Sequence, residues 1–85
     1  MPSTRTREQI IQNIIDSLRR ERERQGRSQN ELARSAGLSQ PMVLRVEKYE
    51  RLPTIDTLLR LADALEVDLG QIISDASRER GRKGH

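Results

Sequence analysis

Two short amphipathic segments, separated by only the three residues 37–39, constrain the fold of this chain more than any other feature. The first segment opens at Ser28, and Glu31 follows three residues later in the spacing of a helix-capping box. It ends at Gly37, because glycine readily adopts the left-handed conformation that terminates many helices. The pattern predicts a helix of two turns over residues 29–36.

The segment after this turn has the features of a second short helix. Ser39 is a typical N-cap, and Pro41 lies in the first turn, where a missing N–H is tolerated. Val43 and Val46 are spaced to face inward. The sequence therefore predicts a helix over residues 40–49. Because the connecting turn is so short, the two helices must cross steeply, and one face of the second is presented outward.

Three further helices are predicted from N-cap residues followed by apolar residues at helical spacing. Their expected openings are Thr6 with Gln9 in a capping box, Thr54 after the break at Leu52-Pro53, and Asp68 with Gln71 in a box. Gly26 is expected to end the first of them. The predicted fold class is all-α, with five helices over about residues 7–25, 29–36, 40–49, 55–65 and 69–74.

The composition favours a small aliphatic domain without catalytic or metal chemistry. The chain has 85 residues, 33% of them hydrophobic and 34% charged, with no Cys, Phe or Trp. A core of this size is marginal by itself, so dimerisation is expected. The one His is the terminal His85, and the acidic residues are dispersed. We therefore expect no enzyme activity, no metal site and no cofactor.

The charge pattern permits a polyanionic partner without demanding one. The net charge is +3, and residues 1–27 carry seven Arg against four acidic residues. We expect a basic arm over residues 1–6, a folded domain over residues 7–74 and a disordered basic tail over residues 75–85. No apolar run approaches the ~18–20 residues of a membrane span, so a cytoplasmic protein without membrane contact is expected.

The combination of these motifs resembles the phage-repressor and Cro family, the xenobiotic-response-element type of helix-turn-helix. The resemblance covers about residues 10–73 and implies a lambda-repressor-like bundle of five helices that binds double-stranded DNA as a homodimer. The residues that carry it are Ser28 to Ala33, Gly37 to Gln40, Val43, Val46-Glu47 and Pro53 to Leu58.

The resemblance also implies roles for individual residues. Gln40, Met42, Leu44 and Arg45 would read base edges in the major groove, where Gln suits adenine and Arg suits guanine. Gln29, Ser39, Lys48, Arg51 and Thr54 would contact phosphate. Arg22 would pair with Glu47 in a structural role.

The sequence departs from the family pattern at four positions. Arg27 replaces a usual apolar residue, and Leu44 replaces a usual polar one. Tyr49 and Glu66 stand where glycine commonly ends the third and fourth helices. The third helix is therefore expected to run on past its usual end.

Three functions are compatible with these features. The first is a transcriptional repressor that acts as a homodimer on a palindromic operator. The second is the antitoxin of a toxin–antitoxin pair, which binds a toxin protein and represses its own operon. The third is a helical dimerisation adaptor that does not read DNA. The candidate dimer residues are Leu69, Ile72 and Ile73, with Ile10 and Ile11 as a second set.

Overall fold

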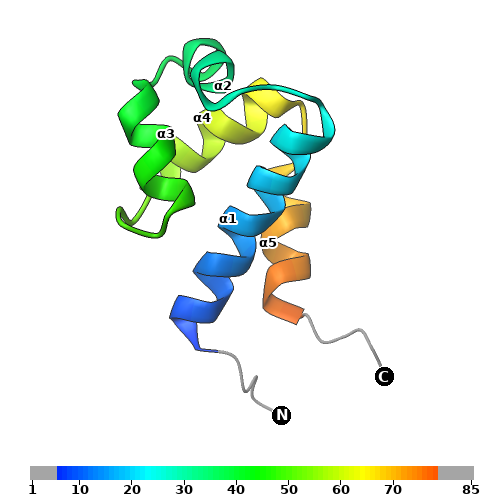
Figure 1. The fold of residues 1–85 in the computed structure, drawn as a ribbon. Coiled ribbons are helices and arrows are strands. Elements are labelled where there is room, and N and C mark those ends of the chain that lie inside the picture. The colour runs from blue at the N-terminus through cyan, green and yellow to red at the C-terminus, as the bar shows by residue number, and fades with distance from the viewer. Residues whose placement is uncertain (1–5, 79–85) are drawn as a thin grey trace.

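The computed structural model describes residues 6–78, which contain five α-helices (Figure 1). This confirms the predicted all-α, five-helix fold. The first and last helices lie side by side, and the other three gather at one end of that pair. The helices are α1 (Arg7–Arg24), α2 (Gln29–Ala36), α3 (Gln40–Glu47), α4 (Ile55–Leu65) and α5 (Leu69–Arg78). Within the described residues, none is both long enough and apolar enough to cross a bilayer.

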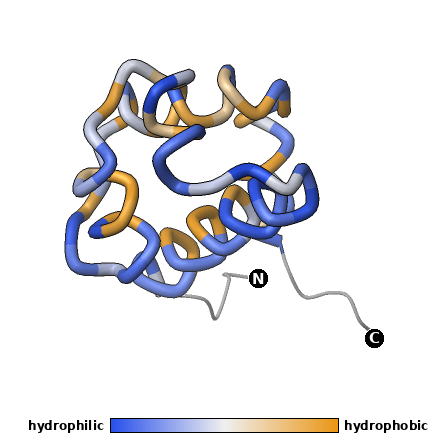
Figure 2. Tube along the Cα trace, turned by 45° about the horizontal axis from the view of Figure 1, so that its top comes forward, coloured by the Kyte–Doolittle hydropathy of each residue, from blue (hydrophilic) through white to orange (hydrophobic). Residues whose placement is uncertain are grey.

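The core is aliphatic and lies where α2, α3 and α4 meet α1. Its most deeply buried large side chains are Leu32, Leu65, Val43 and Val46, each no more than 2% exposed. Hydrophobic stretches alternate with hydrophilic ones along the helices (Figure 2). Because branched aliphatic side chains can interdigitate closely, this core reaches near-complete burial without any aromatic residue.

The predicted N-caps of the first four helices are present. Thr6 and Ser28 each form a complete capping box, and the hydroxyls of Ser39 and Thr54 accept from the backbone N–H three residues on. The expected box at α5 is wrong in part. Asp68 accepts from the N–H of Gly70 at 2.9 Å, but the amide of Gln71 donates to Asp75 instead of returning to the cap.

Each of the first four helices ends at a residue in the left-handed conformation. Gly26 and Gly37 have φ of 71°, and Tyr49 and Glu66 have φ of 61°. In each case the next residue donates its N–H to a carbonyl five positions back, which is the Schellman arrangement. The expectation that α3 would run on to residue 49 is therefore wrong. The helix ends at Glu47 because Tyr49 adopts the conformation that glycine usually supplies.

The last helix is longer than predicted. α5 continues to Arg78, and Ala76 is only 5% exposed because it packs against the core. The predicted tail was therefore wrong for residues 75–78, since burial of one small side chain had no periodic signal in a polar stretch. The rest of that tail, residues 79–85, and residues 1–5 of the predicted arm lie outside the described residues.

Arg27, unexpected in place of an apolar residue, holds the end of α4. Its guanidinium donates to the carbonyl of Ala64 at 2.7 Å. The side-chain amide of Gln25 donates to the carbonyl of Leu65 at 2.9 Å. Carbonyls in the last turn of a helix have no hydrogen-bond partner within that helix. The segment between α1 and α2 therefore supplies partners for two carbonyls at the end of α4.

Substitutions at two of the left-handed residues should change the free energy of unfolding in opposite directions, because one relieves backbone strain and the other introduces it. We expect Glu66→Gly to raise the free energy of unfolding by about 1 kcal/mol, because glycine adopts this conformation without strain. Gly26→Ala should lower it by a similar ~1 kcal/mol, since an added Cβ there meets no atom within 4 Å and only the conformation changes. Urea unfolding followed by circular dichroism measures both. Equal stability of the two variants would contradict this account.

Candidate nucleic-acid interface

The turn between α2 and α3 fixes the crossing of these two helices. Gly37 takes the left-handed conformation, and the N–H of Leu38 donates to the carbonyl of Ala33 at 2.9 Å. Ala33 is 1% exposed, and its small side chain lets the neighbouring helices approach. Leu38 packs partly buried against the core below the turn. The arrangement is the helix-turn-helix geometry expected from the sequence.

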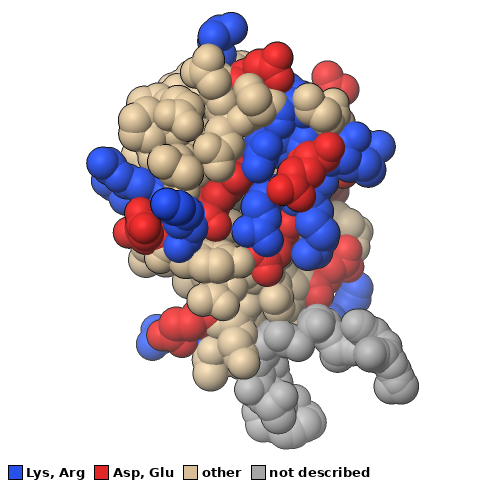
Figure 3. Space-filling model, viewed as in Figure 1, with Lys and Arg blue, Asp and Glu red and all other residues tan. Residues whose placement is uncertain are grey.

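One side of α3 is buried and the other faces outward. Val43, Val46 and Glu47 are buried, whereas Pro41 and Arg45 are exposed. The remaining predicted base-reading residues lie between these extremes: Gln40, Met42 and Leu44 are half-buried. In the region of α3, at the upper left of Figure 3, the surface is mostly uncharged, and basic and acidic side chains lie beside it. Pro41 therefore belongs to the presented face, although the sequence had suggested only a structural role for it.

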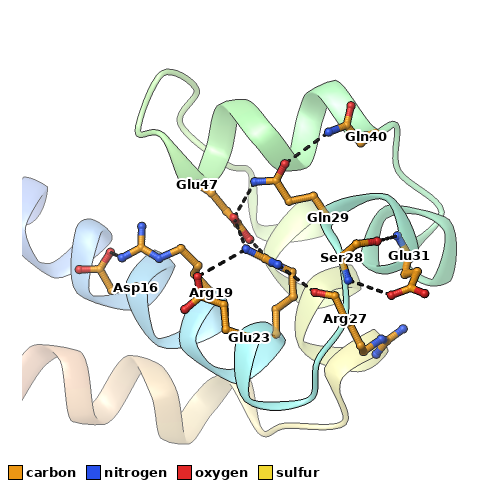
Figure 4. Close-up of polar contacts among 10 residues, drawn as sticks. Asp16, Arg19, Glu23, Arg27, Ser28, Gln29, Glu31, Gln40 and Glu47 are labelled. Carbon is orange, nitrogen blue, oxygen red and sulfur yellow. Dashed lines mark hydrogen bonds and ion pairs between the residues drawn. The ribbon is translucent and has the colours of Figure 1, made fainter.

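A chain of hydrogen bonds runs from α1 to the start of α3 (Figure 4). Arg22 donates to both carboxylate oxygens of Glu47, from Nε at 2.7 Å and from Nη2 at 2.9 Å. Glu47 also accepts from the amide of Gln29 at 2.9 Å. The amide of Gln40 in turn donates to the oxygen of Gln29 at 3.3 Å. The orientation of Gln40 is thus linked to residues on α1, α2 and α3.

The Arg22–Glu47 pair named from the sequence is almost entirely removed from water. The side chains are 11% and 9% exposed. The hydrogen bonds to Glu47 raise the pKa of Arg22 above its ordinary value. A further guanidinium N–H of Arg22 donates to the carbonyl of Arg27 at 2.9 Å. Because most of its donors are satisfied, the buried charge is compensated, and the pair joins α3 to α1 and to the link before α2.

The predicted phosphate-contacting residues lie on α2, at the starts of α3 and α4 and in the loop between those two helices. Ser39 and Thr54 are exposed and use their hydroxyls as helix caps. Lys48 and Arg51 are exposed in the loop of residues 48–54. Gln29 is half-buried within the hydrogen-bond chain, so part of its amide is already occupied.

The loop of residues 48–54 is joined to α1 by a contact that the sequence did not suggest. The hydroxyl of Tyr49 donates to the carboxylate of Asp16, which also accepts from Arg19 at 3.2 Å. The pKa of Tyr49 is raised above its ordinary value, chiefly because of this hydrogen bond. No local pattern pairs residues 33 positions apart, so only the tertiary structure could reveal it.

The predicted dimer residues are less available than the sequence suggested. Leu69 is buried at 8% exposure, and the other four are partly buried against the bundle: Ile10, Ile11, Ile72 and Ile73. The large exposed apolar side chains are instead Leu52, Ile55 and Leu59, at 70%, 63% and 52%. A hollow of about 260 Å³ is lined only by apolar residues, among them Leu52 and Ile55 together with Ile11 and Ile73, whereas Leu59 lies outside its lining. We use the term α4 apolar face for the following five residues: Ile11, Leu52, Ile55, Leu59 and Ile73.

The Arg22–Glu47 pair predicts a large loss of stability when one partner is removed. We expect Glu47→Ala to lower the free energy of unfolding by about 3 kcal/mol, because Arg22 is left charged and buried. The double variant Arg22→Met/Glu47→Leu should lose less than Glu47→Ala. The exposed Asp56–Arg60 pair at 2.8 Å is the control, and Asp56→Ala should cost below about 1 kcal/mol. Similar losses for Glu47→Ala and Asp56→Ala in urea unfolding would contradict the role of burial.

A family model described as Helix-turn-helix matches residues 18–72. No curated protein sequence matches the chain. A crystal structure of a mutant of the restriction-modification controller protein C.Esp1396I is similar in fold, with a TM-score of 0.71 and 20% sequence identity, and the match covers 78% of this chain and 90% of that one. The chain therefore belongs to the helix-turn-helix family of the phage-repressor and Cro type and contains a DNA-binding domain of that family.

Proposed function

We propose that this protein is a sequence-specific transcriptional regulator, a repressor that binds a two-fold symmetric operator as a homodimer. The observation that carries the proposal is the outward face of α3, held in place by the buried Arg22–Glu47 pair and the hydrogen bonds to Gln29 and Gln40. A preorganised helix loses little freedom on entering the major groove, which is about 12 Å wide.

Four side chains of α3 are proposed to read bases. Arg45 is exposed and free to reach guanine with two parallel donors. Gln40 keeps its side-chain oxygen and one amide N–H available beside its bond to Gln29, which suits adenine. Met42 and Leu44 are half-buried and offer apolar contact to a thymine methyl.

Phosphate contacts are proposed on both sides of α3. Lys48 and Arg51 provide exposed charge. Ser39 and Thr54 stand at helix starts, where the first backbone N–H groups have no partner within the helix. The amide of Gln29 is bonded to Glu47. We infer that Gln29 contacts phosphate with its backbone N–H and its remaining amide N–H. Such contacts fix the register of the protein on the duplex, and base contacts then specify the sequence.

The homodimer is proposed to form through the α4 apolar face. An isologous interface needs a surface that is compatible with itself, and the apolar hollow beside Ile55 meets that need because its lining carries no charge. This replaces the sequence-based choice of Leu69, which is buried, and retains Ile11 and Ile73. Two copies related in this way would read half-sites about 34 Å apart and exclude polymerase from the operator.

Base reading predicts a loss of discrimination when the outward side chains of α3 are shortened. We expect Arg45→Ala and Gln40→Ala each to weaken operator binding by about 1–3 kcal/mol, with less loss on random DNA. Fluorescence anisotropy against a selected operator and a scrambled duplex measures both. Arg78→Ala removes the same charge from the far end of α5 and should change little. Equal weakening on every sequence would count against base reading.

The proposed dimer predicts a monomer when charge enters the α4 apolar face. Wild-type protein should sediment at twice the chain mass of 9.8 kDa, and Leu59→Glu should sediment as one chain. Asn30→Glu adds the same charge to an exposed site on α2 and should leave the dimer intact. A folded Leu59→Glu variant that remains dimeric would exclude this face. Co-purification of a different polypeptide would instead favour the antitoxin function.

A further inference from the structure

We propose that Tyr49 is a positioning residue that holds the loop of residues 48–54 against α1, so that Lys48 and Arg51 meet the DNA phosphates. The inference rests on the proposed DNA-binding function and adds to it the means by which the loop is fixed. Three observations support it: the left-handed backbone conformation of Tyr49, the hydrogen bond from Tyr49 to Asp16, and the hollow between the loop and α1.

The backbone conformation of Tyr49 is unfavourable for a bulky side chain. Among the described residues, only Tyr49 and Glu66 have positive φ without being glycine. Such conformations persist where the surrounding structure compensates for them, and they mark positions worth examining for function. Glycine at residue 49 would end α3 with less strain. The same conformation occurs at Glu66, so what distinguishes Tyr49 is the contact that its side chain makes.

The Tyr49 hydroxyl provides that role. It donates to Asp16, which lies on α1 and is itself held by Arg19 at 3.2 Å. The Tyr49 residue is 44% exposed, so burial of its ring is incomplete. The hydrogen bond joins the end of α3 to the middle of α1, and an ionised acceptor makes it stronger than a bond between neutral groups.

The contact between the rest of the loop and α1 leaves a hollow. A hollow of about 180 Å³ separates the two, with Ile11 and Ile15 on the helix side and Leu52 and Pro53 on the loop side. Packing along this stretch is therefore incomplete, although Ile15 itself is only 3% exposed. The Tyr49–Asp16 bond is the polar connection at its edge.

The loop carries two basic residues, Lys48 and Arg51, against the one acidic residue Glu50, so its net charge of +1 favours a phosphate backbone. Lys48 immediately precedes Tyr49, and Arg51 follows two residues later. Both are exposed, and neither forms an ion pair with any residue in the range 6–78. Each phosphate neutralised contributes to affinity and steepens its dependence on salt. A loop held in one place keeps both charges directed at the same stretch of backbone.

The hydrogen bond can be tested in the free protein. Tyr49 is the single Tyr, and the chain has no Trp, so tyrosinate absorbance reports its titration directly. We expect a wild-type midpoint above the ordinary value of 10.0, as the Asp16 contact implies. Asp16→Ala should return the midpoint toward that value. Identical midpoints in the two proteins would show that the bond is absent in solution and would overturn the inference.

The functional test separates positioning from stability. Tyr49→Gly relieves the backbone strain but removes the hydroxyl, so it should bind operator and random DNA about five-fold more weakly, with a salt slope lower by about one phosphate contact. It should unfold no more readily than wild type. Tyr49→Phe, which loses only the oxygen, should show the same weakening. Glu66→Gly is the matched control, with strain relieved at a distant helix end and DNA binding unchanged.

The outcomes distinguish this inference from the proposed function. If wild-type protein prefers an operator but Tyr49→Phe binds it with unchanged affinity and salt slope, positioning by Tyr49 is excluded and the regulator remains. If wild-type protein prefers no sequence and binds no DNA at low salt, both proposals fail. Reduced slope in Tyr49→Phe, with no further reduction when Lys48→Ala is added, would support the inference.

Discussion

The buried pair between Arg22 and Glu47 is the interaction on which the presented helix depends. It joins α3 to α1 across a sequence distance of 25 residues, and its remaining hydrogen bonds reach Arg27 and Gln29. An ion pair this far from water is stable only when nearly every donor and acceptor is satisfied. That requirement selects one orientation of α3, and through Gln29 it also constrains Gln40 at the start of the helix. The pair that stabilises α3 and the Gln40 side chain proposed to read DNA therefore belong to one hydrogen-bond network.

A second constraint acts at the helix ends, where the chain must reverse direction within a few residues to enter the next packed helix. Four helices end with a left-handed residue, yet only two of these residues are glycine. The two exceptions differ in what their side chains contact. Tyr49 reaches Asp16 on α1, whereas Glu66 is exposed and has no hydrogen bond from its side chain among the described contacts. Strain at one helix end thus accompanies a tertiary contact, and at the other it does not.

The small domain exposes two different kinds of surface. The outward side of α3 combines uncharged side chains with the basic Arg45, whereas the α4 apolar face includes Leu52, Ile55 and Leu59. A domain with so small a core leaves part of its apolar surface uncovered. The uncovered apolar surface around Ile55 is the one proposed to bind a second copy.

The sequence by itself determined the local structure. N-cap residues, helical spacing and the short turn at Gly37 were enough to place five helices and the outward face around Arg45, because these signals act within one or two turns. Only the tertiary structure decided the end of α3 at Glu47, the extension of α5 to Arg78, the attachment of Arg27 to α4 and the Tyr49–Asp16 contact. Each of these depends on residues far apart in the chain, whose energies appear only once the helices have packed. The exposure of Leu59 and the burial of Leu69 were decided in the same way, since both are leucines at helical spacing and only packing makes them differ.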